Sequence, residues 1–309
     1  KDNLTKEQKN DVRLLKQFFK ANHCYGDKSA VGKVGFIGYS AELLIYHYKN
    51  LQNLFFSFDK LKENPIDFFD RPMSELEKIQ HFQNDYLIIT DPVDKNRNVA
   101  SAISAKAYKY CNHKILEFLS KPNKSFFSIE PIPEIDTSSI DSSIKDKVFI
   151  IEFINEDPDV HYTICRDKLY SLGDGIKANG EKEFSHTERF GKIEFEVYFE
   201  QDREEYNLVI ICEKPKIEKS FLRRGPPSND KVHSDKFKRK NPNYFEKEGF
   251  LWVKSERDYS SFKEFLVDFI KDKVPNNLKI INLSNPDGAK TRSGRRSIYV
   301  LLNMMVPFA

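Results

Sequence analysis

The stretch that organises this chain is Asp91-Pro92-Val93-Asp94-Lys95-Asn96-Arg97-Asn98-Val99-Ala100. The five residues before it, Tyr86-Leu87-Ile88-Ile89-Thr90, have the apolar character of a strand, and a helical pattern begins near Val99. Pro92 fixes its own φ and disfavours helical backbone at the residue before it. Asp94 or Asn98 is suited to cap the helix that follows. We therefore expect a strand, a turn and a helix over residues 86–119.

Arg97 is the residue of this turn with the clearest chemistry. The start of a helix presents free N–H groups and a partial positive charge, and both favour an anion. A guanidinium placed there has a planar set of donors that suits a phosphate or the edge of a base. Spacing alone leaves a second interpretation open, in which Arg97 is a solvated side chain beside an ordinary capped helix.

Length and composition indicate a folded protein of two or three domains. The chain has 309 residues, 39% of them hydrophobic and 31% charged, and it is too long for one small core. No apolar run approaches the roughly 20 residues of a membrane helix, and the first residues do not resemble a signal peptide. The cysteines lack the spacing of a zinc site, so we expect reduced thiols in a cytoplasmic protein that binds no membrane. They are Cys24, Cys111, Cys165 and Cys212.

A basic segment lies in the second half of the chain. Residues 214–257 contain 13 Lys and Arg against 6 Asp and Glu, whereas the net charge of the whole chain is only +3. Aromatic residues are interleaved with these charges, a combination that suits the backbone and bases of a nucleic acid. A lysine-rich solvated surface explains the same composition, so charge alone leaves both interpretations open.

Hydrophobic periodicity predicts an α+β fold whose first part is helical. An apolar stripe with helical spacing runs through residues 9–21, behind a loose polar lead-in, and residues 37–60 are expected to form one or two helices. The glycine-containing residues 22–35 form a loop between them, which lets the backbone approach a neighbour closely. Together with the helix after the Asp91 motif, these elements predict a helical domain over residues 1–120.

The pattern changes after residue 120. Residues 121–147 are rich in proline and serine and make the best candidate for a linker. A buried strand at 148–153, a helix over 159–177 and strands near 193–198 and 208–212 follow. This β-α-β-β order suggests a ferredoxin-like or RRM-like layer.

A second unit of the same kind is expected further along the chain. A strand near residues 250–254 and a helix near 261–271 follow the basic segment, and an apolar tail ends the sequence. We therefore predict that residues 148–309 form α+β body and tail domains.

Several motifs together resemble the archaeal-type, class I CCA-adding enzymes, which are tRNA nucleotidyltransferases. The decapeptide beginning at Asp91 is similar to the DPVDxxRNVA signature of that family. Val12-Arg13-Leu14-Leu15-Lys16 followed by Tyr25-Gly26, and the segment over residues 35–48, resemble the start of its central domain. Arg223-Arg224-Gly225-Pro226-Pro227 resembles its xGPP motif. The order and spacing of these motifs fit the family from about residue 11 onward.

This resemblance implies addition of CCA to tRNA 3′ ends from CTP and ATP, with Mg²⁺ as cofactor. Lys16 and Tyr25 are then expected to hold the triphosphate of the incoming nucleotide, and Arg97 is expected to contact its base or bridge it to a tRNA phosphate. The tRNA acceptor arm is the implied partner of a tRNA-binding body and tail. The expected contacts to its backbone are Arg223, Arg224, a Gly225-Pro226-Pro227 turn, Lys238, Arg239, Arg292, Arg295 and Arg296.

The catalytic head of the family precedes the Val-Arg-Leu-Leu-Lys segment, which here begins at residue 12. Two Mg²⁺ ions need closely placed carboxylates, usually an Asp/Glu-x-Asp pair after a Gly-Ser turn. Asp157-Pro158-Asp159 lacks that turn, and Asp91 and Asp94 have the wrong spacing. We therefore assign no catalytic or metal-binding residue, and we expect this chain to be inactive alone. The head either was removed or is a separate subunit that docks on the central domain.

Two other functions are alternatives for this sequence. A stand-alone RNA-binding protein derived from the family would bind RNA in a salt-sensitive way and would not be rescued by any head domain. A related polymerase-β or oligoadenylate-synthase type of protein acting on another substrate is disfavoured, because the Arg-Asn-Val-Ala and Gly-Pro-Pro motifs occur in one chain.

Overall fold

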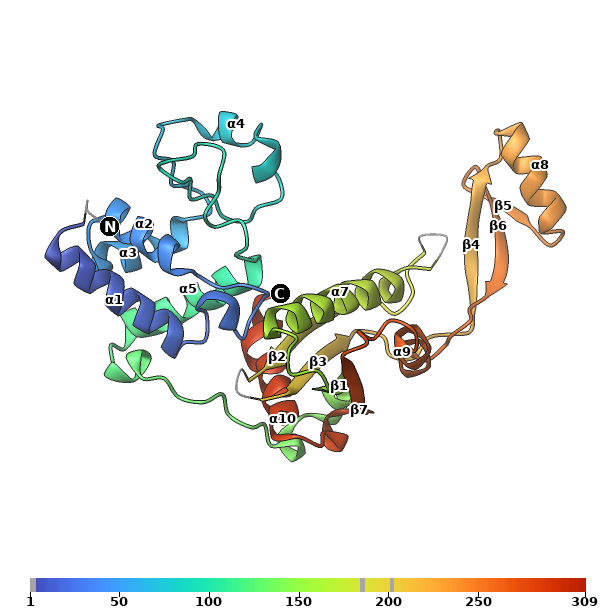
Figure 1. Ribbon diagram of the computed structural model, residues 1–309. Helices are drawn as coiled ribbons and strands as arrows, with labels where there is room; N and C mark the ends of the chain where they lie inside the picture. The colour runs from blue at the N-terminus through green and yellow to red at the C-terminus, as the bar shows by residue number, and fades with distance from the viewer. Residues whose placement is uncertain (1–3, 184–186, 201–202) are drawn as a thin grey trace.

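The computed structural model describes residues 4–183, 187–200 and 203–309, and it confirms the predicted α+β mixture of helices and antiparallel sheets. Figure 1 shows a helical part at the N-terminal end, a central layered part and a hairpin unit that projects from it. The helical part surrounds one core in which Phe18, Phe19, Phe36 and Phe58 are completely buried. Its helices are α1 (Lys6–Ala21), α2 (Gly38–Tyr48), α3 (Leu51–Ser57), α4 (Met73–Leu76) and α5 (Ala105–Ser120).

Helix α1 begins earlier than the apolar stripe predicted. The Thr5 side chain accepts a hydrogen bond from the backbone N–H of Gln8, and the Gln8 side chain accepts one from the N–H of Thr5. This capping box satisfies two donors that a helix start otherwise leaves without partners. Residues 6–9 of the expected loose lead-in are therefore helical, and residues 1–3 lie outside the described residues.

The prediction for the Asp91 motif was wrong in one respect, because helix α5 begins at Ala105 and is capped by Ser104. Asn98 does not cap it. The side-chain oxygen of Asn98 accepts from the backbone N–H groups of Ile89 and Ala100, each at 2.9 Å. Asn98 thus ties the motif back to the preceding segment, which forms isolated bridges rather than a strand. The motif lies in a loop and not at a helix start.

The central part contains a four-stranded antiparallel sheet with the strand order β2-β3-β1-β7. Along the chain its elements follow a β-α-β-β-α-β order, which is the succession found in ferredoxin-like layers. Two helices cover one face of the sheet, and α10 with the π-helical turn after it covers the other. The elements are β1 (Val148–Asn155), α7 (Tyr162–Glu181), β2 (Ile193–Phe199), β3 (Glu205–Cys212), α9 (Phe262–Ile270), β7 (Leu278–Ser284), α10 (Arg292–Tyr299) and the π-helix Val300–Met305.

Helix α9 packs on this sheet rather than forming a second unit with the strand before it. The ring centroids of Phe149 on β1 and Phe262 on α9 are 5.1 Å apart, within one continuous core. Strand β7, which the sequence analysis did not predict, pairs with β1 and has a register shift between Glu152 and Phe153. The expected strand and helix therefore belong to two different layers.

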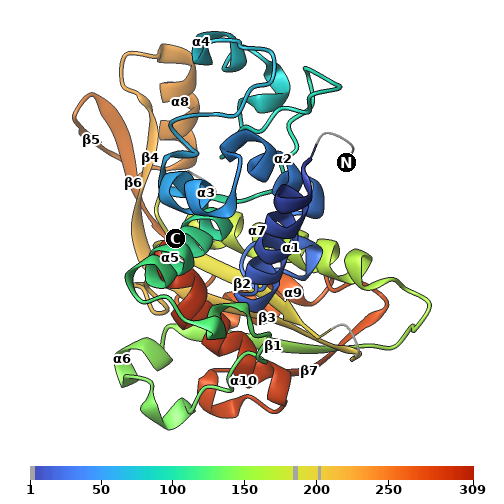
Figure 2. The same ribbon diagram turned by 90° about the vertical axis from the view of Figure 1, so that its left-hand side faces the viewer.

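The second face of the sheet connects the central and helical parts. Figure 2 shows the segment that begins with α10 running up to α5. There the rings of Tyr110 on α5 and Phe308 have centroids 5.6 Å apart, and Val31 and Ile150 lie in the same core. Residues 121–147 link the two parts on the outside, with short helical turns that include α6 (Ser142–Lys145).

Between β3 and α9 the chain forms the hairpin unit, a three-stranded antiparallel sheet in the order β4-β6-β5 with helix α8 against β4. Gly225-Pro226-Pro227 lies at the end of β4, so the expected turn is a strand, with a register shift between Arg224 and Pro227. The elements are β4 (Ser220–Pro227), α8 (Lys231–Lys240), β5 (Phe245–Lys247) and β6 (Phe250–Glu256). Among the described residues, no helix has the length and apolar character that crossing a membrane requires.

Candidate functional site

Lys16 and Tyr25 meet at the first turn of α2. Gly38 opens this helix after Ile37, whose side chain makes no capping hydrogen bond. A Cβ atom at Gly38 would lie 3.2 Å from the Tyr25 hydroxyl oxygen and 3.3 Å from Nζ of Lys16. Two residues singled out from the sequence are therefore brought together beside a helix N-terminus, where N–H groups and the helix dipole favour an anion.

Glu42, one turn further along α2, is the partner of Lys16. Nζ of Lys16 lies 3.1 Å from Oε1 of Glu42, and both side chains are about three-quarters or more buried. A second cation is nearby, because Nζ of Lys20 lies 5.3 Å from the ring centroid of Tyr25. The site thus contains two cations, of which Lys16 is paired with a carboxylate.

Arg97 pairs with the buried carboxylate of Asp91. Asp91 is only 4% exposed, and its Oδ2 lies 3.3 Å from Nη1 of Arg97. Its Oδ1 accepts from the hydroxyl of Tyr39 at 2.9 Å and from the N–H of Val93 at 2.9 Å. The Arg97 side chain is 60% exposed, so its remaining donors face outward. Arg97 thus owes its orientation to Asp91 and not to a helix start.

Tyr39 connects the two halves of the site. It follows Gly38 directly in α2, and its hydroxyl reaches the Asp91 motif. Burial and the bond to Asp91 raise the pKa of Tyr39, which keeps its hydroxyl protonated as a donor. Tyr39 lies in the motif over residues 35–48, but the sequence alone predicted no role for it, because its partner Asp91 lies 52 positions away.

An apolar groove of about 390 Å³ lies beside these residues. Helix α2 supplies one wall and the Asp91 motif supplies another. Val93 at its edge is 88% exposed. The lining residues are Leu4, Tyr39, Glu42, Leu43, Tyr46, Phe68, Pro92 and Val93. A cationic helix start, an outward guanidinium and an apolar groove thus lie together.

The basic residues of the hairpin unit divide between its two faces. Arg223 faces α8, where its Nη2 donates to Asn241 at 2.8 Å and its guanidinium carbon lies 5.3 Å from the ring centroid of Phe237. Arg224 points to the opposite face, as alternation along a strand requires. Its guanidinium carbon lies 3.5 Å from the ring centroid of Phe250, and the side chain is exposed.

The open face around Arg224 combines cations with aromatic rings. Arg224 pairs in register with Trp252, which pairs with Phe245 on the other side, and Lys254 follows two residues later on the same face. On the opposite side of the hairpin unit, α8 carries Arg239, which is exposed, and Lys238, which is half-buried with its Nζ 5.5 Å from the ring centroid of Tyr244. Each side of the unit therefore presents cations beside aromatic rings, the chemistry expected of RNA contacts.

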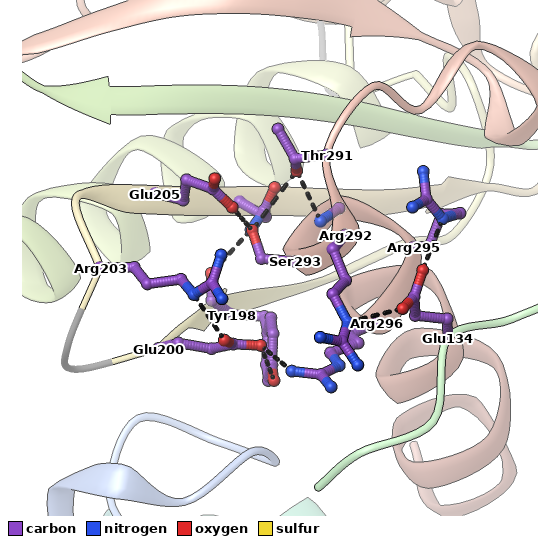
Figure 3. Close-up of polar contacts among 12 residues, drawn as sticks. Glu134, Tyr198, Glu200, Arg203, Glu205, Thr291, Arg292, Ser293, Arg295 and Arg296 are labelled. Atoms are coloured by element: carbon purple, nitrogen blue, oxygen red, sulfur yellow. Dashed lines mark hydrogen bonds and ion pairs between the residues drawn. The ribbon is translucent and has the colours of Figure 1, made fainter.

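The arginines of α10 have partners inside the protein (Figure 3). Nε of Arg292 and Nε of Arg295 lie 2.6 and 2.8 Å from the two oxygens of Glu134 in the linker. These bonds lower the pKa of Glu134. Arg296 is 7% exposed and pairs with Glu200 after β2. Because Arg296 is buried and already paired, the structure does not support the expected contact between Arg296 and RNA.

Among the described residues, no group of three or more His, Cys, Asp or Glu side chains is arranged to hold a metal ion. The candidate site itself suits the binding of an anion and a planar group. It has cationic and hydroxyl donors beside the start of α2, an outward guanidinium and an apolar groove.

The sequence of this chain is similar to that of known tRNA nucleotidyltransferases. Residues 10–128, which include most of the helical part, match the family described as tRNA nucleotidyltransferase, second domain. The chain as a whole is related to CCA-adding enzymes, as the motifs indicated. The enzyme of Archaeoglobus fulgidus is 28% identical over 264 residues, which are 84% of this chain and 56% of the relative.

Two further CCA-adding enzymes show the same extent of similarity. That of Methanothermobacter thermautotrophicus is 28% identical over 87% of this chain and 56% of the relative. That of Methanococcus maripaludis is 29% identical over 92% of this chain and 62% of the relative. The chain therefore spans somewhat more than half the length of the curated relatives it matches.

Proposed function

We propose that this chain is the nucleotide-contacting and tRNA-binding portion of a cytoplasmic CCA tRNA nucleotidyltransferase. In this proposal CTP and ATP are the nucleotide substrates and the tRNA acceptor arm is the partner. The Mg²⁺-binding carboxylates come from a head domain or subunit outside these 309 residues. Residues 1–120 form the nucleotide-contacting domain, 121–147 the linker, and 148–309 the tRNA-binding body and tail.

One observation carries the proposal: the Lys16 ammonium and the Tyr25 hydroxyl converge on Gly38 at the uncapped start of α2. A triphosphate needs several cationic and hydrogen-bonding donors in one place. Lys16, Tyr25 and the first N–H groups of α2 supply them, and Gly38 leaves room for the phosphate to approach the backbone.

The base of the nucleotide is proposed to lie near Arg97. The buried Asp91 holds one side of the guanidinium and leaves the other donors directed outward. A planar fork of N–H donors suits the acceptor edge of a base, and it also reaches a phosphate that lies close by. The groove lined by Tyr39, Pro92 and Val93 offers apolar surface beside it.

The tRNA is proposed to contact the open face of the hairpin unit. On that face Arg224 and Lys254 provide charge for the phosphate backbone, while Trp252 and Phe245 add aromatic surface. Lys238 and Arg239 on α8 are proposed to contact the backbone from the other side of the unit. Arg292 and Arg295, with side chains 55% and 35% exposed, are secondary candidates because Glu134 already neutralises part of their charge.

The test is addition of CMP and AMP to a tRNA that lacks its 3′ CCA. The chain is assayed alone and mixed with a separately expressed head domain from the same genome. Activity in the mixture alone supports the proposal. Incorporation by the pure chain shows that the carboxylates are within it and contradicts the division of roles.

A stand-alone RNA-binding protein is the second candidate, favoured by the exposed cationic and aromatic face of the hairpin unit. It predicts tRNA binding that weakens steeply with salt and no nucleotide incorporation in any mixture. The same assay therefore separates the two functions.

A further inference from the structure

The loop that carries Tyr25 is closed upon itself. The N–H of Gly26 donates to the carbonyl of Phe36 at 2.9 Å, and the N–H of Phe36 donates to the carbonyl of Cys24 at 2.9 Å. A Cβ atom at Gly35 would lie 2.2 Å from the Cys24 carbonyl oxygen, so the two ends of the loop touch. Because Gly38 follows at once, a displacement of this loop changes the position of Tyr25 against the start of α2.

The outer end of the same loop is held by the central part of the molecule. Tyr162 on α7 donates its hydroxyl to Oδ2 of Asp27 at 2.7 Å, and Arg166 donates from Nη1 to the Asp27 carbonyl at 3.2 Å. Nζ of Lys33 lies 3.3 Å from Oδ1 of Asp167. The loop and the central part are thus joined on one side by polar contacts, of which those of Tyr162 and Lys33 are partly exposed and that of Arg166 comes from a buried side chain.

The buried contact is made by Glu196 on β2. This side chain is 1% exposed, and its Oε2 accepts from the backbone N–H of Gly32 at 2.9 Å. Its Oε1 accepts from the Tyr170 hydroxyl and from the N–H of Val197 at 3.2 Å. Burying a carboxylate costs free energy unless each oxygen is bonded, and here both are.

The backbone of Gly32 is closely packed at this contact. Its φ is +74°, and a Cβ atom there would lie 2.4 Å from Oγ of Ser104, the cap of α5. The backbone of the loop is therefore enclosed between α5 on one side and the Glu196 carboxylate on the other. Lys106, in the first turn of α5, pairs with Glu194 on β2 at 2.5 Å, which keeps these two walls together.

We propose that Glu196 is a positioning residue for nucleotide binding, which acts through Gly32 to set the loop and so the Tyr25 hydroxyl. This inference rests on the proposed nucleotide site. It assigns to a strand of the proposed tRNA-binding part a role in the geometry of the triphosphate contact, although Glu196 itself touches no substrate.

The experiment uses the active mixture of chain and head domain and compares Glu196→Ala, Tyr25→Phe and the double variant. Glu196→Ala is expected to raise the KM for ATP and CTP by about threefold to thirtyfold, a range typical of coupled groups, and to leave the KM for tRNA unchanged. In the Tyr25→Phe background the same substitution is expected to have little further effect, because its action passes through the Tyr25 hydroxyl.

Two variants separate positioning from general stability. Glu196→Gln keeps an acceptor for Gly32 while its amide donates to the Tyr170 oxygen, so it is expected to restore most of the nucleotide affinity. Glu152→Ala removes an equally buried carboxylate of the same sheet that accepts from the N–H of Thr291, the cap of α10, and it is expected to lower stability without changing the KM for ATP. If Glu196→Ala does not fold, Glu196→Asp withdraws the carboxylate from Gly32 by one methylene.

The outcomes are distinct. An inactive mixture with the unmodified chain overturns the proposed function and this inference with it. An active mixture in which the effects at Glu196 and Tyr25 simply multiply, or in which Glu152→Ala has the same effect on KM, overturns the inference and leaves the proposed function standing.

Discussion

Asp91 and Arg97 form an ion pair in which one partner is buried and the other is exposed. Oδ2 of Asp91 lies 3.3 Å from Nη1 of Arg97, with side-chain exposures of 6% and 60%. The pair spans a turn closed by its own backbone, since the N–H of Asp91 donates to the carbonyl of Arg97 at 2.9 Å. The carboxylate therefore fixes one edge of a guanidinium whose other donors face outward.

Arg97→Lys tests whether this outward fork reads the nucleotide. Lysine keeps the charge but loses the planar donors, and loss of a charged hydrogen bond costs about 1.5–3 kcal/mol, roughly tenfold or more in affinity. We expect the KM for CTP and ATP in the mixture with the head to rise by that factor. Lys95→Ala, at an exposed residue of the same turn, is the matched control and should change little. Equal effects of the two substitutions would contradict the role of Arg97.

The second prediction is that substitutions of Lys16 and Glu42 change the affinity for ATP in opposite directions. Lys16→Ala removes a cation from the triphosphate site and is expected to weaken binding of ATP much more than binding of AMP. Glu42→Gln removes the carboxylate 3.1 Å from Lys16 and is expected to tighten ATP binding by about twofold to fivefold, the value of a partly exposed ion pair. Calorimetric titrations with ATP and AMP measure both. Weaker ATP binding by Glu42→Gln would show that Glu42 chiefly positions Lys16.

The hydrophobic pattern of the sequence was sufficient to predict elements with extensive burial, on one face for α1 and on both faces for β1. The stripe Val12, Leu15, Phe19 correctly indicated α1, and the apolar run from Val148 indicated β1, because burial dictates both patterns. It failed for β7, whose residues are mostly half-buried at the edge of the sheet and so show little alternation.

The site depends on contacts that spacing does not reveal. Nothing local to Asn98 indicates that its side chain binds Ile89 rather than capping a helix. Likewise, Arg296 has the composition of an RNA contact, and only the fold shows that Glu200, 96 positions away, neutralises it inside the protein. Lys16, Tyr25 and Arg97 were found from motifs, whereas Tyr39, Asp91 and Glu196 became visible as partners only in three dimensions.

Adjacent arginines on β4 give the third prediction, because they point to opposite faces. Arg224→Ala removes an exposed cation and is expected to weaken tRNA binding and to reduce the slope of log K against log salt by about 1. Arg223→Ala removes a side chain bonded to Asn241 and packed on Phe237. It is expected to destabilise the hairpin unit and to leave that slope unchanged. Fluorescence anisotropy with labelled tRNA at several salt concentrations distinguishes them, and equal slopes for the two variants would place the RNA elsewhere.

The fourth prediction concerns His23, a half-buried imidazole with φ +55° at the junction of the helical part and the linker. Burial, together with repulsion from Lys114, lowers the pKa of His23 in spite of a hydrogen bond with the backbone of Glu130. The folded protein thus binds a proton at His23 less readily than the unfolded chain. Its contribution to stability is present above the ordinary value of 6.5 and is lost as the pH falls below it.

His23→Asn removes this titration and fits the backbone, since asparagine tolerates a positive φ better than most residues. Between pH 7.5 and 5.5 the unmodified chain is expected to lose more free energy of unfolding than the variant. Urea denaturation at the two pH values measures this difference. His81→Asn, at an exposed residue of the helical part, is the control and should retain the full pH dependence of the unmodified chain. A pH dependence shared equally by all three proteins would mean that protonation of His23 is not what weakens this junction in acid.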